Sequence, residues 1–215
     1  MKKRHVSAVL TFTCVIIVSL LVCVSASAAQ RRSSFYLWGQ LEKESQGSPV
    51  PSGTAEPPAI VGGHFSISAD ELNRTIDVQE LIDPASAETA AKQLLIERYS
   101  LYYQAEQEGC VVTDEYIDDL IKQEISMFAE GTPNNSDYED FLAGLGMTNE
   151  EYWYSCRDML KMTASIGNWK QKKYDEFISE NGFDMSPPED LDALWAEHLN
   201  ALTAEIIARE HIKTV

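Results

Sequence analysis

The sequence has few basic side chains for its length, and this scarcity limits what the protein can bind. Its 215 residues include 17 Lys and Arg against 34 Asp and Glu. Residues 1–29 hold three of the basic residues and no acidic one, so the remainder carries 14 basic and 34 acidic residues, a net charge of −20. Contacts with nucleic-acid phosphates need Lys and Arg, so a nucleic-acid-binding role is excluded. An anionic membrane surface would also repel this acidic body, so we expect membrane contact only through the N-terminal segment.

The sequence also lacks the motifs that are typical of enzymes. It contains no glycine-rich loop ending in Lys-Ser or Lys-Thr, no Gly-x-Ser-x-Gly turn, and no cysteine with the neighbours of a nucleophile. His198 and His211 have no second histidine four residues away, the spacing that places two imidazoles on one helical face for zinc. We therefore expect no catalytic residue, no metal site and no cofactor, and we expect that the protein is not an enzyme.

Cysteine is scarce beyond the N-terminal segment. Cys14 and Cys23 lie in an apolar stretch near the N-terminus, which leaves Cys110 and Cys156 in the rest of the chain. In an oxidising compartment these two residues could form a disulfide. Two separate, buried thiols are an equally supported alternative, because a single pair of cysteines does not define a disulfide framework.

Residues 1–29 have the pattern of an export segment. Basic residues at positions 2–4 precede an uncharged, apolar run over residues 6–29. Ala26, Ser27 and Ala28 supply the small-x-small pattern for cleavage near Ala28, but the apolar run also reaches the roughly 20 residues that a transmembrane helix needs. The segment is thus either a cleaved signal peptide or a single transmembrane anchor. Both alternatives leave the basic residues in the cytoplasm, so we expect the body to be extracytoplasmic, anchored or secreted.

The rest of the chain divides into a linker and one domain. Residues 30–58 hold four prolines among Ser, Gly, Gln and Glu, a composition that predicts a flexible linker. Residues 59–215 predict a mainly α-helical domain. At its start, residues 60–67 (IVGGHFSI) form a short apolar piece around two glycines, which predicts one small strand or a hairpin.

Capping residues and apolar periodicity predict the helices of this domain. Three pairs match the capping-box pattern at a helix N-terminus: Ser68 and Glu71, Ser136 and Glu139, and Thr148 and Glu151. A helix over residues 87–108 is expected to end at Gly109, and Thr113 is expected to cap the next one. The Thr148 pair is expected to open a long helix, and the last helix is expected over residues 187–209.

Methionine and aromatic side chains are concentrated in the middle of this domain, where they suggest a surface for apolar ligands. Flexible Met and amphipathic Tyr suit contacts with varied apolar partners. The candidate substrate-binding residues are Met127, Phe128, Tyr138, Phe141, Met147, Tyr152, Met159 and Met162. The alternative is that most of these residues build the core, which is the commoner role for such side chains.

Three phrases of the sequence, in this order, resemble a known family. Residues 61–68 (VGGHFSIS) resemble an opening strand V-x-G-x-x-I-(S/T), with Gly62 where Asn is common. Residues 95–115 match a helix that ends in glycine and is followed by an apolar residue and Thr-Asp-Glu, and residues 141–152 match a phrase Phe, spacer, G-(L/M)-(S/T)-x-E-E-Y. Residues 60–178 thus resemble the N-terminal, substrate-binding domain of SurA-type periplasmic chaperones and PrsA-type foldases, and more distantly the peptide-binding domain of trigger factor.

The resemblance implies a function and a fold. It implies a SurA N-terminal-like multi-helix domain whose final helix packs back on the first helices, and an ATP-independent chaperone-like module whose partners are unfolded or newly exported polypeptides. Family members usually carry a parvulin prolyl isomerase domain of about 90 residues before the final helix, but only residues 180–188 stand there in this chain. We therefore expect no isomerase activity. The alternative function is an envelope-tethered interaction or scaffold protein that holds one dedicated partner.

Overall fold

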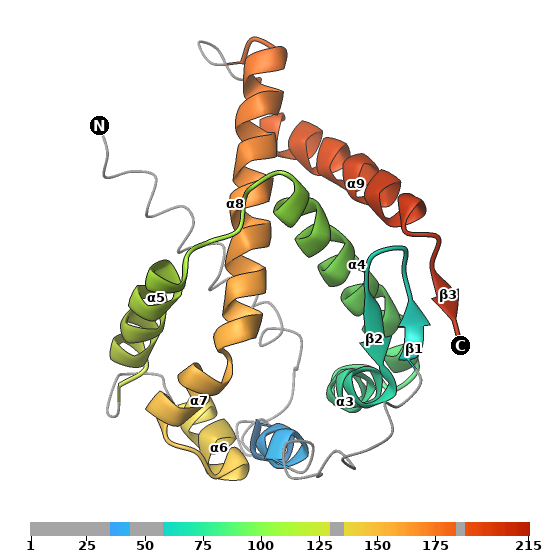
Figure 1. Ribbon diagram of the computed structural model, residues 1–215. Helices are drawn as coiled ribbons and strands as arrows, with labels where there is room; N and C mark the ends of the chain where they lie inside the picture. Colours follow the sequence, from blue (N-terminus) through green and yellow to red (C-terminus); the bar gives the residue numbers. More distant parts are fainter. Residues whose placement is uncertain (1–34, 44–57, 130–135, 184–187) are drawn as a thin grey trace.

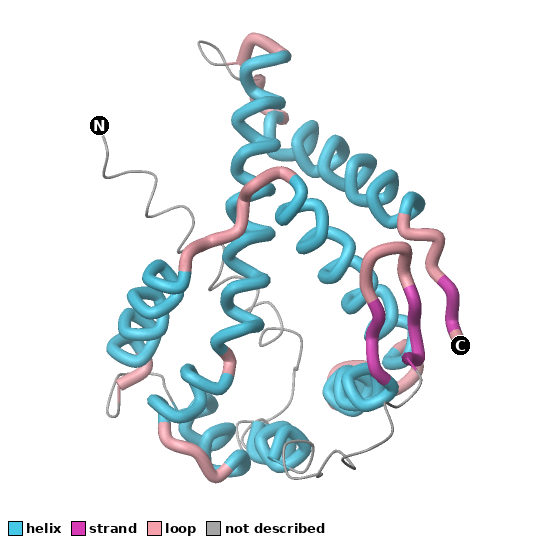
Figure 2. Tube along the Cα trace, in the orientation of Figure 1, coloured by secondary structure: helices cyan, strands magenta, loops and turns pink. Residues whose placement is uncertain are grey.

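The computed structural model describes residues 35–43, 58–129, 136–183 and 188–215, and these residues form a mainly α-helical fold (Figures 1 and 2). The predicted fold class is thereby confirmed. The export segment, the remaining residues of the expected linker up to residue 57, and Ser186 and Pro187 lie outside the described residues.

The small strands lie at one edge of the molecule (Figure 2). β1 (Pro58–Val61) and β2 (Ser66–Ser68) form the predicted hairpin, and the turn is closed by the Gly62 N–H, which donates to the Phe65 carbonyl at 2.9 Å. A strand that the sequence does not predict, β3 (Lys213–Thr214), pairs antiparallel with β1 on its other side, so the sheet order is β2-β1-β3. The two ends of the domain are therefore joined in one sheet.

The first two helices of the domain begin where the sequence predicts. α3 (Ala69–Glu80) is capped by the Ser68 side chain, which accepts from the Glu71 N–H at 3.1 Å. The Glu71 carboxylate does not complete the capping box; it accepts instead from the Tyr99 hydroxyl at 2.8 Å and so ties α3 to α4 (Ala87–Gln107). α4 ends as predicted, because Gly109 adopts a left-handed φ of 68°.

Three further helices and the first turn of a fourth form a separate group. Its members are α5 (Asp114–Met127), α6 (Ser136–Leu145), α7 (Asn149–Ser155) and α8 (Arg157–Glu180). Thr113 caps α5 as predicted, and Thr148 and Glu151 form the complete capping box of α7. The single long helix expected after Thr148 is interrupted at Cys156, where the chain turns from α7 into α8.

The last helix packs back on the first part of the domain, as the resemblance implies. α9 (Leu191–Arg209) begins later than expected but ends where predicted, and it lies against α4 (Figure 1). Directly after it, the buried carboxylate of Glu210 accepts from the backbone N–H of His64 at 3.0 Å, and the Glu210 carbonyl accepts from the Gly63 N–H at 2.7 Å. These bonds fasten the end of α9 to the hairpin turn.

The apolar core consists of separate clusters. One lies under the sheet and holds Ile60, Ile67, Leu72, Ala91 and Leu95. Another joins α4, α8 and α9 and holds Leu101, Ala105, Trp169 and Ile206. A third joins α5, α7 and α8 and holds Val112, Ile117, Leu120, Ile121, Trp153, Leu160 and Ala164. The long helix α8 links the last two clusters, so the α5 to α7 group stands apart from the sheet and α3 (Figure 1).

Nine residues of the segment expected to be a flexible linker, 35–43, form a helix beside α6. The two helices touch through glycines: a Cβ on Gly39 would lie 2.1 Å from the Phe141 carbonyl oxygen, and one on Gly144 would lie 2.1 Å from the Tyr36 carbonyl oxygen. The Trp38 ring packs on Phe141 with centroids 4.9 Å apart. The local composition shows none of this, because the helix depends on contacts with residues about 100 positions away.

Candidate functional site

Five aromatic rings from the ends of α5, α6 and α7 form one cluster, which we call the aromatic cluster. Each ring has at least two others in the cluster with a centroid 4.8–6.5 Å away, which is the range for favourable ring pairs. Its members are Phe128, Tyr138, Phe141, Tyr152 and Trp153. Four of these five are candidate residues from the sequence, so the fold brings together Phe128, Tyr138, Phe141 and Tyr152.

The polar side chain of Asn149 fixes the geometry of the aromatic cluster. Its amide donates to the carbonyls of Ile125 and Phe128, at 2.9 and 3.1 Å, and so holds the C-terminal turn of α5. Its carbonyl oxygen accepts from the Tyr138 hydroxyl at 2.8 Å. Because Asn149 is the first residue of α7, one side chain connects the three helices that carry the rings.

The rings at the centre of the aromatic cluster are buried, and those at its edge are partly exposed to solvent. Phe141 and Trp153 are 5% and 2% exposed, while Phe128, Tyr138 and Tyr152 are half-buried. Burial raises the pKa of the Tyr138 and Tyr152 hydroxyls above the usual value, so both side chains stay neutral at any physiological pH. The cluster therefore presents uncharged, mainly apolar surface.

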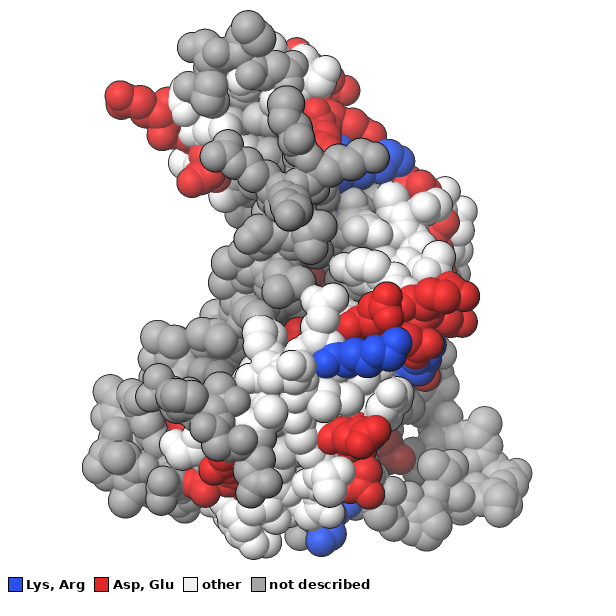
Figure 3. Space-filling view, turned by 90° about the vertical axis from the view of Figure 1, so that its left-hand side faces the viewer, with Lys and Arg blue, Asp and Glu red and all other residues white. Residues whose placement is uncertain are grey.

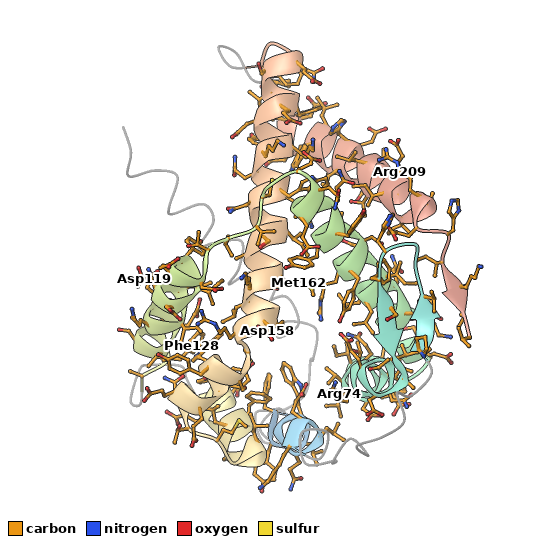
Figure 4. All side chains as sticks on the ribbon, in the orientation of Figure 1. Arg74, Asp119, Phe128, Asp158, Met162 and Arg209 are labelled. Atoms are coloured by element: carbon orange, nitrogen blue, oxygen red, sulfur yellow. The ribbon has the colours of Figure 1, made fainter. Side chains whose placement is uncertain are left out.

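The methionines among the candidate residues do not all join the aromatic cluster. Met127 is 40% exposed on the last turn of α5, next to Phe128, and Met159 is 43% exposed on the first turns of α8. Met147 and Met162 are half-buried. Figure 4 places Phe128 at the junction of α5 and α7, whereas Met162 lies further along α8, so Met162 belongs to a different part of the molecule.

Three residues at this site are not among the candidate substrate-binding residues predicted from the sequence. Trp153 is the most buried ring of the cluster, and Trp38 reaches Phe141 from the helix at 35–43. Asn149 was not singled out, because its hydrogen-bond partners lie on other helices, 11 to 24 positions away in the sequence. A signal was present for one contact: an isolated glycine such as Gly144 inside a helical pattern often marks a close approach of backbones.

The two cysteines are free and lie in different parts of the core. Cys110 packs against the cluster of α4, α8 and α9, and Cys156 packs against the cluster of α5, α7 and α8. The structure thus has the separate thiols that were one of the two alternatives. Burial raises the pKa of the Cys156 thiol, which keeps it protonated and slow to react.

Three side chains of α8 bond to one carboxylate at the end of α4. The Glu108 carboxylate accepts from Trp169 Nε1 at 2.8 Å, from Lys172 Nζ at 2.7 Å and from Lys173 Nζ at 2.8 Å. α8 also lines a shallow depression of about 610 Å³ over residues 168–180, and every residue that lines it has a polar or charged side chain. No apolar residue lines this depression, so it is not a candidate for the apolar binding surface.

The surface is mixed around these features. Acidic side chains stand out on the face shown in Figure 3, Lys and Arg are fewer, and uncharged side chains form continuous areas between them. Among the described residues, no group of three or more His, Cys, Asp and Glu side chains is placed to hold a metal ion. Of the helices described, none has both the length and the apolar character that crossing a membrane demands.

A comparison with protein-family models matches residues 1–166 to the SurA-like N-terminal domain. The chain belongs to this family. The SurA-like match includes the helix at 35–43 and all of the aromatic cluster, and it ends within α8, so α9 and β3 lie beyond it. Searches of curated proteins and of solved structures found no match to the chain. The chain therefore contains a SurA-like module, and the family predicted from the three sequence phrases is confirmed.

Proposed function

We propose that this SurA-like protein is an extracytoplasmic, ATP-independent chaperone-like module that binds apolar stretches of unfolded or newly exported polypeptides. Family membership supports a role in the handling of polypeptides. The observation that carries the proposal is the aromatic cluster, because it lies within the matched residues and borders exposed apolar side chains. A polypeptide that covers this region would bury apolar surface, worth about 25 cal/mol per Å².

Exposed side chains on α5, α7 and α8 suit varied ligands. Met127, Tyr154 and Met159 are 40%, 46% and 43% exposed on the three helices α5, α7 and α8. A thioether side chain with three rotatable bonds adapts to irregular apolar shapes, and a tyrosine offers an apolar ring with a polar tip. Contacts of this kind are weak individually and separate quickly, which a protein that must release its clients needs.

The acidic body fits the same proposal. A net charge of −20 beyond residue 29 keeps a complex with an aggregation-prone client in solution, because like-charged particles repel one another. Residues 1–29 would direct the protein out of the cytoplasm and, where they are retained, hold it at the membrane.

We propose further that the protein is not an enzyme and has no prolyl isomerase activity. Only residues 181–190 separate α8 from α9, at the place where related proteins insert about 90 residues of parvulin domain. Proline isomerisation in a model peptide should therefore proceed at its uncatalysed rate in the presence of the protein.

An aggregation assay with the purified protein tests the proposal. Heat-denatured citrate synthase should scatter less light when the protein is present at stoichiometric excess. Met127→Gln combined with Met159→Gln should weaken this effect about threefold or more, because the exposed apolar edge is lost while the buried rings remain. Leu94→Gln is the matched control, since Leu94 is 38% exposed on α4, away from the aromatic cluster, and should change nothing.

Two results would argue against the proposal. No suppression at stoichiometric excess would refute general client binding. Tight capture of a single envelope protein together with no suppression would favour the dedicated interaction or scaffold function instead.

A further inference from the structure

The helix at 35–43 covers part of the aromatic cluster, although it belongs to the chain before the domain. Its Trp38 ring lies on Phe141 at a centroid distance of 4.9 Å, and Phe35 follows at 6.4 Å from Trp38. Phe141 is only 5% exposed in this arrangement. An element outside residues 59–215 thus occupies the surface that we assign to polypeptide binding.

The contact between this helix and α6 selects a particular kind of segment. Gly39 and Gly144 face each other so closely that a methyl group on either would lie 2.1 Å from a carbonyl oxygen of the opposite helix. Side chains at these two positions would force the backbones apart. The surface of α6 therefore accepts a helix that carries a glycine, with a bulky aromatic residue directly beside it to reach Phe141.

Three features of the occupant indicate that it can leave. Nine residues are too few for a helix that is stable in isolation, so its order depends on its contacts with the domain. The Trp38 indole N–H is buried without a hydrogen-bond partner, an unfavourable arrangement that ends when the helix is released into water. Tyr36 and Leu37 remain 42% and 46% exposed, so two of the five large apolar side chains of this helix gain little from docking.

We propose that the surface of α6 around Phe141 and Gly144 is a docking site for short helical segments with an aromatic residue next to a glycine. In the free protein residues 35–43 occupy this site, and a client segment of the same chemistry displaces them. The inference rests on the proposed function, for which it names the substrate class and a built-in competitor. With a resident competitor, the apparent affinity for clients equals the intrinsic affinity multiplied by the fraction of time that the site is free.

Three glycine-to-alanine variants of the purified protein distinguish this proposal from a purely structural role of the helix at 35–43. Gly39→Ala should expel the resident helix and leave the site free. Gly144→Ala should expel it and also block the site. Gly167→Ala is the control, because it lies in α8 and a Cβ there meets no atom within 4 Å. All three glycines are helical, so the gain in helix propensity is the same and differences report the contact.

The probe is a fluorescent, capped peptide with the sequence of residues 35–43, and the readout is its anisotropy. Relative to the unaltered protein and Gly167→Ala, the peptide should bind about tenfold more tightly to Gly39→Ala and should not bind detectably to Gly144→Ala. Equal binding by Gly39→Ala and Gly144→Ala, or no binding by either, would overturn the docking site. A concentration-dependent dimer of the unaltered protein that Gly144→Ala abolishes would assign the site to a second copy and would also overturn it.

A second probe separates this inference from the proposed function. Reduced, carboxymethylated α-lactalbumin is permanently unfolded, and its binding should speed hydrogen exchange in residues 35–43 as they are released. Binding without faster exchange there would leave the proposed function standing and contradict displacement. If no variant binds α-lactalbumin but Gly39→Ala still binds the peptide of residues 35–43, the docking site would stand and the proposed function would be contradicted.

Discussion

At the scale of single residues, Glu108 is the best-connected carboxylate of the described chain. It is 17% exposed and accepts hydrogen bonds from two lysines, a tryptophan and Gln104. Burial alone would raise the pKa of Glu108, but the bonds from Lys172, Lys173, Trp169 and Gln104 outweigh it and lower the pKa to about 2. The carboxylate therefore joins the end of α4 to the middle of α8 in its charged form.

The pKa of Glu108 gives a stability prediction with a definite direction. A carboxyl whose pKa is lower in the folded state stabilises the fold above its unfolded pKa, near 4.5, and loses this contribution as the pH falls toward 2. Glu108→Gln should lower the free energy of unfolding at pH 7 by about 2 kcal/mol and flatten its pH dependence between 4.5 and 2. Urea unfolding at several pH values measures both effects.

The exposed carboxylate of Glu180, at the end of α8, provides the control for Glu108. Glu180→Gln should leave the stability at pH 7 within about 0.5 kcal/mol, because surface substitutions away from special contacts change little. Equal losses in the two variants would show that Glu108 is not the connection described here.

At the scale of elements, the sequence predicts helix starts better than it predicts which helices meet. Ser68, Thr113 and Thr148 cap helices in the structure as they were expected to, because a cap is a bond to backbone only two or three residues away. The break at Cys156 and the late start of α9 were not foreseen. The helix at 35–43 and strand β3 were missed because both depend on distant partners, α6 and β1 respectively.

The candidate site was predicted in part for the same reason. Composition picked out four of the five rings in the aromatic cluster, since bulky apolar side chains on short helices usually meet somewhere in a fold. It could not separate them from Met162, nor show that Trp38 covers Phe141, because both facts depend on the directions of packed helices. Periodicity along one helix carries no such information.

The role of β3 in joining the two ends of the domain leads to a second stability prediction. Removal of residues 211–215 should lower the free energy of unfolding by about 2 kcal/mol, because the strand bonds to β1 and the partial burial of Ile212 in the cluster under the sheet are lost. Lys213→Ala should have almost no effect, since the Lys213 side chain is exposed and the backbone pairing remains. Chemical unfolding measures both, and full stability of the shortened chain would contradict the structural role of β3.

At the scale of the whole molecule, the separate apolar clusters place a group of three short helices away from the sheet. α8 connects this group to the rest. The ion pairs from Arg157 to Asp118 and from Lys161 to Asp114 join the first turns of α8 to α5. Exposed ion pairs contribute little to stability, so the apolar contacts of α5 and α7 with α8 hold the group in place. The aromatic cluster thus lies on a unit that is joined to the remainder mainly through α8, an arrangement that would suit the proposed binding of varied polypeptides.

Site-specific photocrosslinking tests most directly whether this unit is where polypeptides bind. A photoreactive amino acid replaces either Met127, at the edge of the aromatic cluster, or Leu94 on α4, two positions with nearly equal exposure of 40% and 38%. With unfolded, carboxymethylated α-lactalbumin as the partner, we expect adducts from position 127 at least five times as abundant as those from position 94. Equal adducts from both positions, or none from position 127, would contradict the account.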